Sequence, residues 1–155
     1  MKGHQQIIDT LNELLADELA AINQYIVHAE MCEDWGYEHL HEAHEGRAIQ
    51  EMKHAEKLIQ RIIFLEGTPV VSQLSKIRIG SEVKTQHTND RDAEEMAIKA
   101  YNEGIRLAVE LGDNGTRELL EGILTDEEEH IDWIEAQLDQ IEQMGLSNYL
   151  VEQIG

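Results

Sequence analysis

The feature that most constrains the fold is an internal repeat with an offset of 76 residues. The motif Glu-x-x-His occurs at Glu51–His54 and again at Glu127–His130. Each copy has a glutamate 33 residues upstream, Glu18 for the first and Glu94 for the second. A single offset therefore relates every member of the pattern, and we interpret the chain as two related helix pairs joined end to end.

The apolar residues predict long helices. Leu11, Leu14, Leu15 and Ile22 recur at the i, i+3, i+4 spacing of a helix with one apolar face. The chain has one proline, which permits long uninterrupted helices. We expect a fourth long helix to be capped by Thr116. The predicted helices cover about residues 5–35, 37–66, a start between 81 and 90 up to 112, 116–144, and a short segment over 149–154.

The connections predict the topology. Residues 67–80 carry apolar side chains with little helical order, so we expect a long crossover there. Short turns at Gly36 and at Asp113–Gly115 should make each helix pair antiparallel. The expected fold class is all-α, a four-helix bundle with a long crossover between helices two and three and a short C-terminal fifth helix. A length of 155 residues with 41% hydrophobic residues suits one domain over residues 1–155.

The repeated glutamates and histidines predict a buried metal site. Residues i and i+3 share a helix face, so the Glu and His of one motif can reach the same ion. Glu18, Glu94 and Glu127 interrupt the apolar stripes of their helices, so they should point inward. Buried carboxylates need a compensating cation or they take up protons. One Glu-x-x-His is more often an exposed helical pair, but two copies with matched upstream glutamates favour a site for iron, manganese or zinc.

The composition narrows the function classes. There are 12 basic and 32 acidic residues, a net charge of −20, which argues against nucleic acid as a partner and favours cations, although excess carboxylates also keep proteins soluble. Cys32 is the only cysteine, so the chain can form neither an internal disulfide nor a CxxC site. No apolar run approaches the ~18 residues of a membrane span. We expect a cytoplasmic protein with no membrane segment and no signal peptide.

Long collinear runs resemble the bacterioferritin family along nearly the whole chain. They are the opening MKG, LADELAAINQY, EMKHAEKLIQRIIFLEG, and DEEEHIDWIEAQLDQI followed by MGLSNYL. The resemblance implies a ferritin-like di-iron domain. It also implies iron storage and detoxification, with a ferroxidase that oxidises Fe(II) using dioxygen or peroxide. The expected partners are iron ions, a homo-oligomeric shell of twenty-four subunits built from two-fold dimers, and a ferredoxin-type reductant for iron release.

The resemblance also assigns roles to the candidate ligands. Glu51 and Glu127 would bridge the two irons, Glu18 and Glu94 would be terminal carboxylates, and His54 and His130 would each bind one iron. Tyr25 would be a nearby electron donor, and the alternative is a core tyrosine that bonds a ligand carboxylate.

Met52 matches the residue that ligates haem in this family. It follows Glu51 by one residue, so it is rotated about 100° away from the metal site and should face out of the bundle. The resemblance implies haem b shared between two subunits, each giving one Met52 sulfur across a two-fold axis. From spacing alone, an outward methionine is usually interface packing.

The sequence departs from the family at several positions. Many bacterioferritins have His and Asp where this chain has Gly46 and Gln50, which puts an inner-surface iron site in doubt. Glu45 stands where an aromatic residue is common. The histidines of the second helix could bind metal, but we expect them on a solvated face. They are His39, His41 and His44.

Two other hypotheses are open at this level. A rubrerythrin-like di-iron peroxidase without shell storage would share the ligand pattern, but such proteins usually add a CxxC module. A metal-free structural bundle would leave the inward glutamates unexplained.

Overall fold

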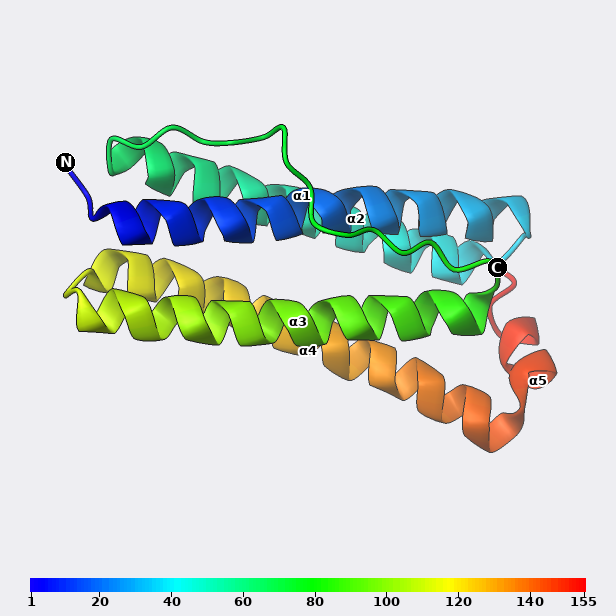
Figure 1. Ribbon diagram of the computed structural model, residues 1–155. Coiled ribbons are helices and arrows are strands. Elements are labelled where there is room, and N and C mark those ends of the chain that lie inside the picture. The colour runs from blue at the N-terminus through cyan, green and yellow to red at the C-terminus, as the bar shows by residue number, and fades with distance from the viewer.

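The computed structural model describes all 155 residues, and every regular element in it is helical. Helices α1 and α2 form one antiparallel pair, α3 and α4 form the second, and α1 packs against α3 (Figure 1). The short α5 lies across the end of the bundle where α4 finishes. The bounds are α1 Gln5–Asp34, α2 Glu38–Phe64, α3 Val83–Glu110, α4 Asn114–Met144 and α5 Leu146–Val151. The predicted fold class is confirmed.

Two predicted helix boundaries were wrong. Helix α4 is capped by Asp113 rather than Thr116, because the Asp113 carboxylate accepts a hydrogen bond from the Thr116 backbone N–H at 3.0 Å. The fifth helix begins at Leu146 and not at residue 149. Gly145 alone breaks the helix, with a φ of +83° that favours glycine, and the chain resumes helical geometry directly after it.

The apolar core is divided into two clusters along the bundle. The larger lies toward the start of α1 and includes Leu11, Leu14 and Leu120. The smaller lies at the opposite end, where Cys32 and Tyr149 pack together. Most inward positions between the two clusters are polar or charged, and these side chains are buried. The bundle therefore has a polar middle section that lies between two apolar clusters, one at each end.

The crossover from α2 to α3 lies along α1 (Figure 1). Asn12 on α1 accepts a hydrogen bond from the Val70 N–H at 2.8 Å, and further along Gln24 accepts one from the Arg78 N–H at 3.1 Å. The Gly80 N–H donates to Nε2 of His28 at 3.0 Å. These bonds satisfy backbone groups that have no helical partner and fix the crossover over the polar middle section.

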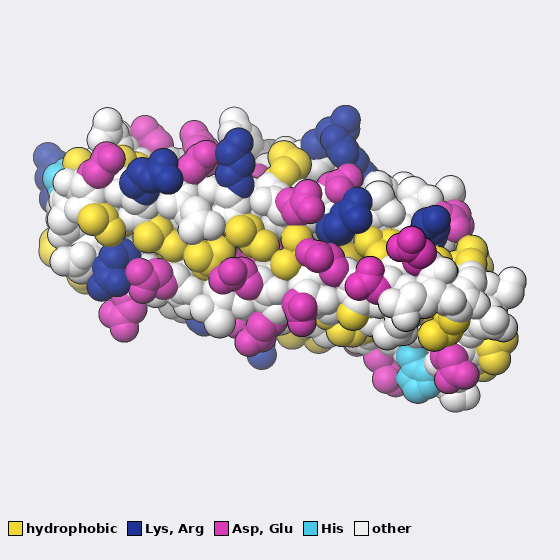
Figure 2. Space-filling view, turned by 90° about the horizontal axis from the view of Figure 1, so that it is seen from below, with side chains coloured by type: hydrophobic (Ala, Val, Ile, Leu, Met, Phe, Trp, Pro, Cys, Tyr) yellow, Lys and Arg dark blue, Asp and Glu magenta, His cyan; other side chains and the backbone are white.

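The outer surface is mixed in character. On the face seen in Figure 2, acidic and basic side chains are scattered on both sides of a lengthwise band of hydrophobic side chains. None of the helices combines the length and apolar character needed to cross a membrane.

Candidate metal centre

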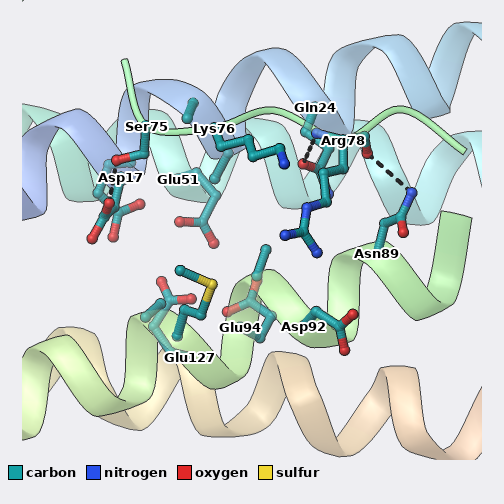
Figure 3. Close-up of a pocket in the computed structure, with 16 residues that line it drawn as sticks. Asp17, Gln24, Glu51, Ser75, Lys76, Arg78, Asn89, Asp92, Glu94 and Glu127 are labelled. Carbon is teal, nitrogen blue, oxygen red and sulfur yellow. Dashed lines mark hydrogen bonds between the residues drawn. The ribbon is translucent and has the colours of Figure 1, made fainter. Parts of the chain in front are cut away.

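Six side chains from four helices meet in the middle of the bundle. Nδ1 of His54 lies 3.0 Å from Glu127 Oε1 and 3.6 Å from Glu18 Oε2. Nδ1 of His130 lies 3.0 Å from Glu51 Oε1 and 3.6 Å from Glu94 Oε1. The carboxylates of Glu51, Glu94 and Glu127 approach one another from three helices in Figure 3. The structure therefore brings together all six residues that the repeat singled out.

The six residues form two overlapping sets of potential ligands. The first set is Glu18, Glu51, His54 and Glu127, and the second is Glu51, Glu94, Glu127 and His130. Within each set the donor atoms lie within 4.8 Å of one another. Glu51 and Glu127 belong to both sets, which is the arrangement that two carboxylates bridging a pair of ions require.

Each histidine is held by a polar side chain on its outer edge. Nε2 of His54 lies 2.8 Å from Asp126 Oδ2, and Nε2 of His130 lies 2.6 Å from Gln50 Oε1. Because both outer partners are acceptors, each Nε2 carries the proton. Each Nδ1 is then turned toward the carboxylates, and in the neutral ring it offers a lone pair there. Outer partners of this kind fix the tautomer and the orientation of metal-binding histidines.

Two tyrosines hold the carboxylates of Glu94 and Glu18. The Tyr25 hydroxyl donates to Glu94 Oε1 at 2.6 Å, and the Tyr101 hydroxyl donates to Glu18 Oε1 at 2.5 Å. The alternative interpretation of Tyr25, a core tyrosine that bonds a ligand carboxylate, matches this contact. Each bond occupies one carboxylate oxygen and leaves the other free to face the centre.

The protein alone leaves buried polar atoms of the centre without hydrogen-bond partners. One donor or acceptor atom of each of the six residues is buried without a hydrogen-bond partner. These atoms are Glu18 Oε2, Glu51 Oε1, His54 Nδ1, Glu94 Oε2, Glu127 Oε1 and His130 Nδ1. Buried polar atoms in native proteins are nearly always paired, so six orphans around one point indicate a missing partner. Cations fit this donor set of hard oxygens and imidazole nitrogens.

Protons balance the charge when no cation is bound. Burial raises the pKa of Glu18 well above its usual range, and burial together with the charge of Glu127 raises the pKa of Glu94 to about 8. Burial lowers the pKa of His130, but close contacts with Glu127, Glu51 and Glu94 outweigh it and raise the pKa to about 10. The metal-free centre therefore holds extra protons that cations would displace.

A cavity of about 130 Å³ opens onto the centre between α1, α3 and the crossover. Its inner wall includes Glu18, Glu51, Glu94 and Glu127, and its outer wall includes Lys76 and Arg78 from the crossover (Figure 3). Small alanine side chains on α1 and α3 line the passage between them. The centre thus has an opening large enough for a few waters or an ion.

Comparison with known proteins agrees with this geometry. The model of the ferritin-like domain family matches residues 8–144. A bacterioferritin of Brucella melitensis is 42% identical over 149 residues, which cover 96% of this chain and 92% of that protein. This chain belongs to the bacterioferritin family. A bacterial ferritin of Synechocystis is 41% identical over 99% of both chains, and a bacterioferritin of Streptomyces coelicolor is 40% identical over 97% of this chain and 90% of its own.

Sequence reasoning missed part of this bacterioferritin-family site. Tyr101 received no role, and Asp126 was not considered. Gln50 was considered only as a departure from the family, yet its amide oxygen holds His130. A signal was present, because the 76-residue offset relates Gln50 to Asp126 as well as Tyr25 to Tyr101. The two halves therefore repeat the supporting residues along with the ligand candidates.

The expectation of a solvated histidine face on α2 was wrong for His44. His39 is exposed and His41 is partly buried, but the His44 side chain is only 2% exposed. His44 precedes Glu51 by seven residues, two helical turns, so it shares the inward face of α2. Met52, in contrast, faces outward as expected and is 45% exposed.

Proposed function

We propose that this chain stores iron by oxidising it. Two Fe(II) ions bind between the six converging side chains, lose one electron each, and pass as Fe(III) to a mineral inside a hollow protein shell. The observation that carries this proposal is the set of six buried, unpartnered donor atoms around one point. The printed names of the relatives, bacterioferritin and bacterial ferritin, support iron storage as the purpose.

In this proposal the chain's own residues bind the two iron ions, orient them as a pair and neutralise their charge. Glu51 and Glu127 bridge the two ions, while each terminal carboxylate and each histidine binds one of them. The paired arrangement matters because each Fe(II) gives one electron and reduction of dioxygen to peroxide takes two. Two protons complete that balance, and the centre holds protons that the incoming ions displace.

Size-exclusion chromatography with an iron assay tests the proposal. After aerobic Fe(II) loading, we expect a large homo-oligomer that carries many more irons than its binding sites. A small oligomer with only bound iron and peroxidase activity would favour the rubrerythrin-like alternative instead.

We further infer that residues 1–155 act as one domain, that a ferredoxin-type protein reduces the stored iron, and that the protein works in the cytoplasm. The shell of twenty-four subunits is part of the proposal, with the bacterial ferritin relatives as its support.

Blocking the cavity should slow iron entry. Ala93 lines the passage to the centre, so Ala93→Phe should fill it with a ring. We expect Fe(II) oxidation in stopped-flow absorbance to become several-fold slower, while the equilibrium number of bound Zn(II) ions stays the same. Ala136→Phe, the same change at an exposed position of α4, is the control. Unchanged oxidation kinetics in Ala93→Phe would show that ions reach the centre by another route.

We also propose that Met52 ligates haem b at a two-fold contact between subunits. The residues present fit the group, because Met52 is 45% exposed and Ile49, one turn earlier on the same face, is 44% exposed. A thioether is a suitable haem ligand, and apolar neighbours suit the macrocycle. A two-fold axis would bring the Met52 of each subunit to the same contact, where both residues could hold one haem. When bound, the haem would supply one-electron transfer.

Substitution of Met52 tests the haem proposal. Met52→Leu should purify without haem, because leucine has no ligand atom, whereas Met52→His should keep haem with a shifted visible spectrum. Met144→Leu on α4, another exposed methionine, should keep the original spectrum. Initial rates of Fe(II) oxidation should survive all three changes. Haem content in Met52→Leu equal to that of the unmodified protein would refute the assignment.

A further inference from the structure

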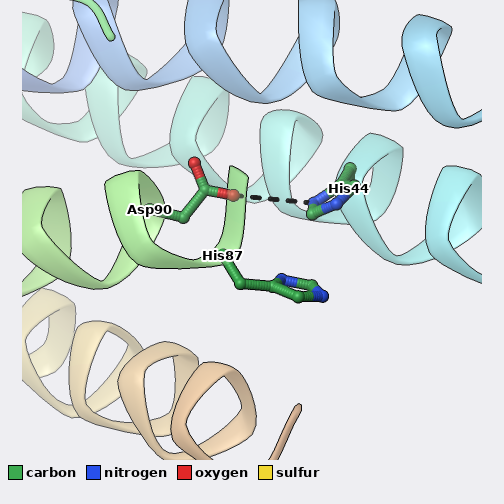
Figure 4. A group of neighbouring side chains, drawn as sticks. All are labelled: His44, His87 and Asp90. Carbon is green, nitrogen blue, oxygen red and sulfur yellow. Dashed lines mark ion pairs between the residues drawn. The ribbon is translucent and has the colours of Figure 1, made fainter. Parts of the chain in front are cut away.

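A second group of potential ligands lies in the polar middle section beyond the six-residue centre. His44 on α2 and His87 and Asp90 on α3 are fully or almost fully buried. Each offers one donor atom, and the three atoms lie within 4.8 Å of one another. Nδ1 of His44 is 3.9 Å from Asp90 Oδ2, and both histidine rings lie beside that carboxylate in Figure 4. None of these residues belongs to the Glu-x-x-His repeat.

Hydrogen bonds fix which nitrogen of His87 is free. The Tyr149 hydroxyl donates its proton to Gln137 Oε1 at 2.7 Å. Because a tyrosine has one proton, its oxygen must accept from His87 Nε2, which lies 3.0 Å away. Nδ1 of His87 is therefore left with a bare lone pair, and it is buried without a partner. A histidine oriented by an outer acceptor with its other nitrogen free has the form of a metal ligand.

Asp90 is held in the same manner from its outer side. Oδ1 of Asp90 accepts a hydrogen bond from Gln24 Nε2 at 2.8 Å. His28 accepts the Gly80 N–H at its Nε2, so its proton is on Nδ1, which lies 3.2 Å from Asp90 Oδ2. These donors orient the carboxylate and support its charge. Each oxygen keeps a further lone pair that an ion between His44 and His87 can use.

The internal repeat shows that apolar residues can occupy the equivalent positions. The 76-residue offset relates His87 to Leu11, Asp90 to Leu14, and His44 to Leu120. Those three leucines pack together in the larger apolar core at the other end of the bundle. Helix packing in this fold therefore does not require polar side chains here. Burying two imidazoles with an unpartnered nitrogen each, Nε2 of His44 and Nδ1 of His87, carries a cost that a structural role leaves unexplained.

The local electrostatics keep both imidazoles in the form that binds metals. Burial, together with the nearby His28, Arg47 and His41, lowers the pKa of His44 to about 3. Burial and the neighbouring His44 lower the pKa of His87 to about 3. Both rings are neutral at physiological pH, and neutral imidazole is the ligand form.

We propose that His44, His87 and Asp90 bind a third divalent transition-metal ion, separate from the pair held by the six-residue centre. Two imidazoles and one carboxylate form a donor set used for Zn(II), Fe(II) and Co(II). Ligand atoms about 2.0–2.2 Å from an ion lie about 3–4 Å apart, so donor atoms separated by the full 4.8 Å would need to close by about 1–2 Å. The ion would lie near the Tyr25 ring, because His44 stacks on that ring with centroids 6.3 Å apart, while the hydroxyl of the same ring contacts Glu94 of the six-residue centre.

Diffraction from crystals of the whole assembly soaked in Co(II), recorded at the cobalt absorption edge, tests the site directly. We expect an anomalous peak bonded to His44, His87 and Asp90, in addition to peaks at the six-residue centre. Peaks at the six-residue centre without one at His44 would overturn this inference and leave the proposed function intact. Peaks at neither place would count against both.

Solution measurements with matched variants provide a second test. Metal analysis after dialysis against Co(II) should give about one ion fewer per subunit in His87→Leu than in the unmodified protein. His39→Leu, an exposed histidine of α2, should lose none. His87→Leu should fold, because leucine occupies the equivalent position in the repeat, and the melting temperature of its metal-free form checks this. Asp90→Asn, which keeps the size of the side chain, should also lose the ion. Equal cobalt content in all four proteins would refute the third site.

Discussion

Replacing Glu94 with glutamine is expected to slow the fast phase of Fe(II) oxidation by at least ~100-fold. Loss of an outer partner alone typically costs about 10–100-fold in metal affinity or activity, and Glu94 is a direct ligand in our proposal. Glutamine keeps the shape of the side chain and an oxygen that can accept the Tyr25 hydrogen bond. It removes the charge that an ion needs. Stopped-flow absorbance after mixing with Fe(II) in air measures the effect.

The matched control is Glu95→Gln, the same chemical change at the exposed neighbouring position on α3. We expect it to oxidise iron at the unmodified rate. The alanine variants Glu18→Ala and Glu94→Ala should also lose rapid oxidation while keeping the assembly, because removing a buried carboxylate relieves repulsion in the metal-free bundle. His130→Ala should lose rapid oxidation because it removes a proposed ligand. Rapid oxidation in Glu94→Gln at the rate of Glu95→Gln would contradict the proposed ligand set.

The ligand candidates could be predicted because their positions depend on helix geometry alone. A spacing of three residues places Glu51 and His54 on one face, and the 76-residue offset assigns the same relation to the second half. The long helices and the crossover follow from apolar periodicity and from the Gly67–Pro69 break. These are local signals, and the structure agrees with them. The metal-binding roles themselves stay a prediction.

The supporting residues were harder to predict because they depend on contacts between helices. The hydrogen bond from His54 to Asp126 joins residues 72 positions apart, and nothing local marks Asp126 as different from the acidic residues beside it. The burial of His44 depends on how α1, α3 and α4 enclose α2 at that level. The start of α5 was missed because Leu146–Asn148 contain polar residues typical of a turn, whereas Gly145 alone completes the turn.

Binding of Zn(II) to the metal-free protein is expected to release about four protons per subunit at neutral pH. Four groups of the six-residue centre have pKa values raised by the fold. Burial raises the pKa of Glu18, and burial with the charge of Glu127 raises that of Glu94 to about 8. Burial alone would lower the pKa values of His54 and His130, but contacts with neighbouring carboxylates outweigh this effect. The pKa of His54 therefore lies far above its usual value, and the pKa of His130 rises to about 10. The values of Glu94 and His130 keep both groups protonated at pH 7, and the raised pKa values of Glu18 and His54 favour their protonated forms too. Each group must lose its proton to act as a ligand.

The pH dependence follows from the same values. The folded metal-free protein binds more protons at these groups than the unfolded chain does, so their contribution to its stability should be present at pH 6.5 and decline as the pH rises through 8 and then 10. Zn(II) competes with those protons, so its apparent affinity should increase over the same range. Proton release should fall by about one as the pH passes 8, because Glu94 is then already ionised.

Calorimetric titration of Zn(II) in two buffers with different ionisation enthalpies counts the protons, and zinc avoids the protons that iron oxidation itself would add. Glu94→Gln should release about one proton fewer, while Glu128→Gln, an exposed neighbour of Glu127, should match the unmodified protein. If Zn(II) binding released almost no protons from the unmodified protein, the metal-free centre would already hold ionised carboxylates and neutral imidazoles. The six orphaned atoms would then face one another as bare charges and lone pairs, and a resident cation or ordered water would be needed to explain how the metal-free bundle folds.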